Sequence, residues 1–144
     1  MRGDKLALAV VLVCAASVFI VYAMTSNIVL RNIGSVKTVG VGVYWDMACS
    51  QVVSVIDWGI MEPSAVKNVT VYVRNEGNSP TTLSLQKDNW NPANASSYIS
   101  LSWNYLGQAI ATNSVIPVTL TLSISSDIQG INSFSFDIII SATG

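Results

Sequence analysis

From Val36 to the end of the chain, apolar and polar residues alternate with a period of two and not with the 3.6-residue period of a helix. A strand with this alternation buries one of its sides and exposes the other to water. The pattern therefore predicts seven strands and no amphipathic helix after residue 35. The alternating stretches are 38–45, 53–58, 69–74, 82–86, 99–104, 118–124 and 133–140.

Turn-forming residues separate the predicted strands. Gly and Asn accept the positive φ angles that tight turns need, and Pro ends strand pairing. Seven short strands with this spacing predict an all-β domain, a seven-stranded immunoglobulin-like β-sandwich over residues 36–144. Trp45 and Trp103 fall on the apolar phases of their strands and are predicted to lie in its core. The turn segments are 62–64, 75–78, 89–92, 106–108 and 129–130.

An apolar segment precedes the predicted domain. Leu6–Met24 runs for roughly 19 residues without a charge, close to the ~20 residues that cross a bilayer as a helix. Arg2 and Lys5 precede it and predict a cytoplasmic N-terminus with the remainder of the chain outside. Residues 1–24 are predicted to form one N-terminal helix, either a retained transmembrane anchor or a cleaved signal, with a pilin-type leader cut after Gly3 as a third alternative. The C-terminal domain is then extracytoplasmic at the cell membrane or secreted to the cell surface.

Residues 25–35 join the apolar segment to the predicted domain and are unusually apolar for a linker. One interpretation is a juxtamembrane linker or an extra first strand of the sandwich. The other is a donor strand that completes the sheet of a neighbouring subunit. The candidate strand-donation residues are Ile28, Val29, Leu30 and Ile33.

Composition narrows the classes of function. Hydrophobic residues make up 51% of the chain and charged residues 10%, against a typical charged share of about 25%. The formal net charge is -1 and no basic stripe is present, so no nucleic-acid partner is predicted. The chain has no histidine, which is the commonest general base and a common metal ligand. We predict no catalytic residue, no cofactor and no metal ion, and interpret the protein as a non-enzyme.

Some residues leave chemical alternatives open. Lys37, Lys67 and Lys87 are candidate bases beside serine, although no spacing supports them. The segment 87–91 offers oxygen donors for calcium, with Asp46 or Asp57 joining from a neighbouring loop, and a plain Asn-rich turn explains the same residues. Of the two cysteines, Cys14 lies in the apolar segment, so Cys49 is either a free thiol or pairs between chains.

Three further residues are candidates for binding or modification. Asn68 and Asn94 each begin an Asn-x-Ser/Thr sequon at a position predicted to face outward, and so are candidate glycosylation sites. Trp90 lies in a polar loop. There it is either a loop contact for a carbohydrate or a lid that closes one end of the sandwich.

Part of the chain resembles known surface proteins. The segment VYVRNEGNSPTTLSL (Val71–Leu85), an aromatic-Asn-Pro loop, the strand PVTLTLSIS (Pro117–Ser125) and the strand FSFDIII resemble short immunoglobulin-like domains of archaeal surface proteins. A strand ending in Arg-Asn-x-Gly-Asn is also similar to archaeal bundling pilins and bacterial biofilm-matrix fibre proteins. In those fibres an N-terminal strand enters the next subunit, and residues 26–33 stand at the corresponding place. The resemblance therefore implies a sandwich that assembles with its neighbours.

Taken together, these features predict a non-catalytic structural or adhesion protein of the cell surface. Its expected partners are the membrane, through the N-terminal helix, and identical subunits or other surface proteins, through strand addition. The alternative is an extracellular binding module whose loops recognise a carbohydrate or a partner subunit of a membrane complex.

Overall fold

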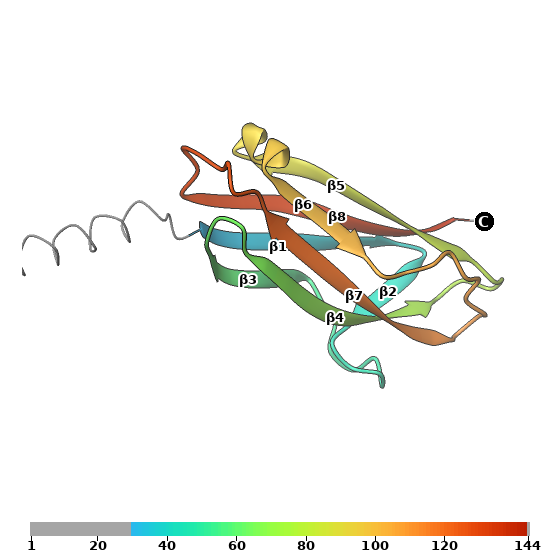
Figure 1. Cartoon of the computed structure of the whole chain (residues 1–144). Helices are drawn as coiled ribbons and strands as arrows, with labels where there is room; N and C mark the ends of the chain where they lie inside the picture. The colour runs from blue at the N-terminus through green and yellow to red at the C-terminus, as the bar shows by residue number, and fades with distance from the viewer. Residues whose placement is uncertain (1–29, 144) are drawn as a thin grey trace, which may run out of the picture.

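A computed structural model describes residues 30–143, which fold as a two-sheet β-sandwich (Figure 1). The all-β sandwich that the period-two pattern predicts is thus confirmed. Within the described residues no helix is long and apolar enough to cross a membrane. The helix predicted for residues 1–24 lies outside them. The strands are β1 (Leu30–Val39), β2 (Val41–Tyr44), β3 (Val55–Met61), β4 (Val66–Asn75), β5 (Thr82–Asn91), β6 (Ile99–Trp103), β7 (Val115–Ile124) and β8 (Ser133–Thr143), and a 3-10 helix, η1 (Ala93–Ser97), joins β5 to β6.

Each sheet has four strands. The first, sheet A, has the order β3-β1-β8-β5, and the second, sheet B, has the order β2-β4-β7-β6. β1 and β8 are parallel neighbours, whereas the other pairs are antiparallel. Because β1 and β8 run in the same direction, the described chain enters at one end of the sandwich and leaves at the other (Figure 1).

The core lies between the sheets and is built most regularly by β7 and β8. Alternate residues of both strands are at most 4% exposed, as their apolar alternation predicts. Ring stacking adds to this packing, because Trp90 lies parallel to Phe136 with 4.3 Å between the ring centroids. The inward residues of these two strands are Val118, Leu120, Leu122 and Ile124, and Phe134, Phe136, Ile138 and Ile140.

The stretch predicted as one strand over 38–45 is two strands in different sheets. Gly40 has a φ of 75°, and there the chain leaves β1 in sheet A and enters β2 in sheet B. The described residues therefore form eight strands and not seven. The prediction of a core position for Trp45 is wrong, because Trp45 lies past the end of β2 and is 38% exposed. Trp103 is half-buried and packs against the core.

Residues 30–35, left open between linker and extra strand, form the first part of β1. Their alternation is the reverse of the apolar pattern, since Asn32 and Gly34 are buried whereas Ile33 is 47% exposed. Gly34 is needed for close approach, because a Cβ there would lie 2.8 Å from Cδ1 of Ile138. β1 therefore contributes few apolar side chains to the core.

Candidate functional site

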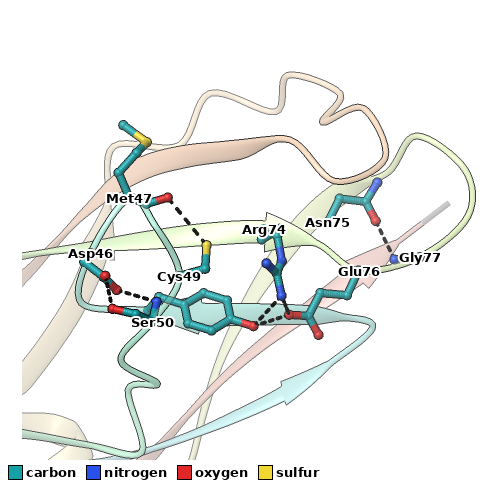
Figure 2. Close-up of polar contacts among 9 residues, drawn as sticks. Asp46, Met47, Cys49, Ser50, Arg74, Asn75, Glu76 and Gly77 are labelled. Carbon is teal, nitrogen blue, oxygen red and sulfur yellow. Dashed lines mark hydrogen bonds and ion pairs between the residues drawn. The ribbon is translucent and has the colours of Figure 1, made fainter.

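The most concentrated group of polar contacts joins the ends of β2 and β4 (Figure 2). Tyr44, the last residue of β2, donates its hydroxyl to the Oε1 atom of Glu76. The Arg74 Nη2 atom donates to the same Oε1 at 2.9 Å and to the Tyr44 hydroxyl at 3.0 Å. The guanidinium carbon also lies 5.0 Å from the centre of the Tyr44 ring, which is a cation–π distance.

Mutual hydrogen bonding fixes the charges of this cluster. The hydrogen bond from Tyr44 is the main reason that the pKa of Glu76 is lowered, with Arg74 adding to it. The same bond raises the pKa of Tyr44, since losing the hydroxyl proton would break it. The carboxylate of Glu76 likewise raises the pKa of Arg74. At neutral pH the cluster thus holds one compensated ion pair and a neutral phenol.

Gly42 makes this arrangement possible. A Cβ at position 42 would lie 2.2 Å from Oε1 of Glu76 and 2.5 Å from the hydroxyl oxygen of Tyr44. Both side chains cross the β2 backbone where glycine leaves room for them. The cluster therefore links the turn after β4 to the short strand β2. The Tyr44 hydroxyl, the Arg74 Nη2 atom and the Glu76 Oε1 atom all bond to one another within the chain.

Asn75 organises the neighbouring turn from the inside. It is 1% exposed, and its side-chain Nδ2 donates to the carbonyls of Ser79 at 2.8 Å and Ile110 at 2.9 Å. Its Oδ1 accepts from the backbone N–H of Gly77 at 2.9 Å. A buried amide with all these bonds satisfied explains the turn that the sequence predicts over 75–78. Sequence reasoning did not foresee that this Asn is part of the core.

The loop between β2 and β3 projects from the body of the sandwich (Figure 1). The Asp46 carboxylate accepts from the hydroxyl of Ser50 and from its backbone N–H at 2.9 Å (Figure 2). It also accepts from the backbone N–H of Gln51 at 3.1 Å. The hydroxyl of Ser50 is the main cause of the lowered pKa of Asp46. Cys49 is half-buried in this loop, with its Sγ 3.7 Å from the carbonyl oxygen of Met47.

The structure divides the candidate strand-donation segment. Ile28 and Val29 lie outside the described residues. Leu30 and Ile33 lie in β1, which is paired on both sides within its own chain, with β3 and with β8. The described part of the segment, from Leu30 onward, thus belongs to the chain's own sheet.

Trp90 lies within β5, so the prediction that it lies in a loop is wrong; the strand continues through the turn predicted over 89–92 as far as Asn91. The Trp90 ring is half-buried and stacked on Phe136. Asn68 and Asn94 are both exposed. Asn94 lies in η1, whereas Asn68 lies within β4 and its Oδ1 accepts from the hydroxyl of Thr121 at 2.8 Å.

The acidic residues named for a calcium site do not converge. Asp57 on β3 and Asp88 on β5 belong to opposite edges of sheet A, three strand spacings or roughly 14 Å apart. Asn89 instead donates its Nδ2 to the Oδ2 of Asp137 at 2.6 Å. In the described part of the chain, no three acidic, cysteine or histidine side chains form a group able to hold a metal ion.

Two lysines have a structural position that the sequence did not indicate. The Lys67 ammonium, on β4, crosses to the other sheet and donates to the carbonyls of Trp58 at 2.7 Å and Ile60 at 3.1 Å on β3. On the other side of the sandwich, the Lys87 ammonium on β5 donates to the carbonyl of Leu101 on β6 at 3.3 Å. Both contacts satisfy backbone carbonyls on edge strands, which are otherwise open to pairing with another chain.

Comparison with known proteins adds no relative. No protein-family model matches the chain, and no curated protein matches its sequence. The resemblance to archaeal surface domains and to fibre-forming proteins therefore stays a prediction.

Proposed function

We propose that the protein is a non-catalytic structural or adhesion module of the cell surface, an immunoglobulin-like sandwich that the apolar N-terminal segment anchors to the membrane or directs to export. The observation that carries this proposal is the parallel placement of β1 beside β8. It puts the entry of the chain, only a few residues after the apolar run, at one end of the sandwich and the exit at the other. A module with this geometry extends the chain away from the membrane.

The outer surface of sheet B supports a role in passive contact. At its centre, the outward side chains of β4 and β7 are uncharged and polar, and several are bonded to one another across the two strands. The Thr70 and Thr119 hydroxyls are 3.0 Å apart, and Thr121 bonds to Asn68. This central group of side chains is soluble without charge and contains no titratable group.

Assembly through strand addition is part of the same proposal. β1 is held mainly by its two backbone ladders, because its inward residues include Asn32 and Gly34. Asn32 also keeps an unpartnered buried Oδ1. Because β1 buries few apolar side chains, little hydrophobic free energy is lost when the β1 of a neighbouring subunit takes its place.

Cell fractionation tests the proposal. We expect the native protein in the membrane or surface fraction, with the sandwich accessible to an added protease or to an antibody on intact cells. The intact mass and N-terminal sequence then separate anchor from export signal. A start near Met1 indicates a retained anchor, and a start near Thr25 indicates cleavage. Recovery of the chain only in the cytoplasm, protected in intact cells, would contradict the proposal.

A binding module is the second candidate, and two hollows on the outer face of sheet A favour it. They lie on either side of Ile33, with volumes of about 280 and 300 Å³. Apolar surface from Ile33 and Ile60 adjoins polar groups of Asn91, Ser133 and Asp57 there. Ile33→Trp would narrow the hollows at the residue that they share, and loss of binding to a glycan array with unchanged unfolding would favour this candidate.

A further inference from the structure

The strand edges of the described sandwich are protected to different degrees. Four of them carry at least one contact that occupies an outward backbone group. Lys67 covers carbonyls of β3, and Lys87 covers one of β6. β5 donates its Leu83 N–H to the Tyr105 hydroxyl at 3.0 Å. The outer edge of β2 is paired with the returning chain, since the Val53 N–H donates to the Val43 carbonyl at 2.9 Å.

The exception is the first half of β4. β2 is only four residues long and pairs with β4 from Tyr72 to Asn75, which leaves Val66–Val71 without a neighbour on that side (Figure 1). The N–H and C=O of Asn75 point toward β7, as its bonds with Ser114 and Asn113 show. Because the direction alternates along a strand, the N–H and C=O groups of Val66, Asn68 and Thr70 point to the open side.

This open stretch has none of the usual protection. Its outward side chains are uncharged, it contains no proline, and its pairing with β7 is regular from Val66 to Arg74 without a bulge. Lys67, the one charged residue in it, turns inward and bonds to β3. Val66 is 60% exposed and Ile60 of β3 is 57% exposed, so the same side of the sandwich also presents apolar surface.

We propose that this edge pairs with the same edge of a second copy, β4 against β4 in antiparallel register around a two-fold axis at Asn68. The register places Val66 opposite Thr70 and Lys67 opposite Val69, so β-branched side chains meet and the two lysines do not face each other. The open N–H and C=O groups form about six backbone hydrogen bonds. Sheet B of each copy thereby joins into one continuous sheet, and the dimer is closed.

A second copy fits this edge better than an unrelated strand because the stretch is complementary to itself. It is uncharged on its outward side, and the whole chain has a net charge of only -1, so two copies approach without strong repulsion. The pairing gives the proposed surface module its partner, and in that sense rests on the proposed function. The β4–β4 pairing gives a closed dimer, whereas head-to-tail donation of β1 from one subunit to the next would give open chains of subunits.

The mass of the full chain in detergent, measured by analytical ultracentrifugation, tests the pairing. We expect two chains per particle for the wild type. Thr70→Pro removes one open N–H, which an edge strand tolerates, and Asn68→Lys puts two positive charges at the axis. Both are expected to halve the mass. Thr70→Val and Asn68→Gln are the matched controls, because they lose the same side-chain contacts and should stay dimeric.

Three results would overturn the pairing: a wild type with the mass of one chain, an Asn68→Lys variant that stays dimeric, or a glycan on Asn68 of the native protein. Circular dichroism shows whether each variant keeps the wild-type fold, and Asn68→Lys decides the test if Thr70→Pro does not fold. A monomer found at the cell surface refutes the pairing alone. A dimer confined to the cytoplasm refutes the proposed function alone.

Discussion

β1 and β8 lie side by side in sheet A and run in the same direction, yet they are held in different ways. The inward residues of β8, from Phe134 to Ile140, are at most 4% exposed and apolar. The inward residues of β1 include Asn32, with an unpartnered Oδ1, and Gly34. β8 is therefore held by side-chain burial as well as by hydrogen bonds, whereas β1 depends mainly on its ladders to β3 and β8. Strand pairing and core formation are separable contributions within one sheet.

The largest effect is expected at the centre of β8. Phe136→Ala removes a buried ring and the stacking partner of Trp90, and should lower the free energy of unfolding by about 3–5 kcal/mol. Urea unfolding followed by tryptophan fluorescence measures it. The matched change on β1 is Val36→Ala, which should cost less than half as much because Val36 is half-buried. Equal losses would contradict the contrast between the strands.

Substitutions at Trp90 test whether the packing around Phe136 of β8 continues across to β5. Trp90→Ala should lower the free energy of unfolding by about 2–3 kcal/mol, since the ring is only half-buried but stacks on Phe136. Trp90→Phe keeps a stacked ring and should recover most of the loss. If Trp90→Ala unfolds like the wild type, the ring is a surface contact and not a lid.

Asn32 offers a way to make β1 more like β8. Asn32→Leu has a similar shape and removes the buried amide oxygen without a partner, so it should raise the free energy of unfolding by about 1 kcal/mol. It also loses the 3.1 Å contact of Nδ2 with the Met61 sulfur. Asn32→Asp is the control and should destabilise, because it buries a carboxylate there. A destabilised Asn32→Leu variant would show that the hydrogen bonds of the buried amide outweigh the cost of its unpartnered oxygen.

The side chains of Lys37 and Asp137 join the two strands on the outer face, 2.7 Å apart. The hydrogen bond from Lys37, followed by that from Asn89, lowers the pKa of Asp137. A carboxyl group with a pKa lowered by folding stabilises above the pKa of the unfolded chain, about 4, and this stabilisation is lost as the pH falls through the folded-state pKa. Asp137→Asn should therefore cost about 0.5 kcal/mol at pH 7. Unfolding midpoints across pH should show the variant and the wild type converging in acid.

Ile33 is expected to give the smallest effect. It is on the outer face of β1, so Ile33→Thr, which keeps a β-branched side chain, should change the free energy of unfolding by less than about 0.5 kcal/mol. The same substitution at Ile138, on the inner face of β8, is the comparison and should cost several times more. A large loss at Ile33 would mean that its register in β1 is shifted by one residue.

The same contrast explains what the sequence could predict. β7 and β8 were predictable in position and phase, because their apolar residues alternate without interruption, although each strand is three residues longer than predicted. The phase of β1 was not predictable, because Ile33 and Val36 would point to opposite faces of one strand. The close approach of Gly34 to Ile138 puts Gly34 and Val36 on the inner face and Ile33 on the outer face. The split at Gly40 was hidden, since Val39, Val41 and Val43 continue one alternation across a change of sheet.

The polar contacts were less accessible to sequence reasoning than the fold. Tyr44 and Glu76 are 32 positions apart in the chain, and only the pairing of β2 with β4 brings them together. Lys67 and Lys87 carried no signal for their carbonyl contacts, because these depend on how the two sheets face each other. The sequence did contain the glycine signal at Gly42, which lacks the side chain that would collide with Tyr44.

The parallel ladder between β1 and β8 has a mechanical consequence. A pull on the two ends of the described chain acts along both strands in opposite directions and loads the ladder in shear. Its paired positions, from Arg31 with Ser133 to Val39 with Ser141, then bear the force together and do not open one after another like a zipper. We therefore expect a high unfolding force in an optical trap, even though β1 contributes few apolar side chains to the core. Resistance of this kind would suit the surface module proposed above.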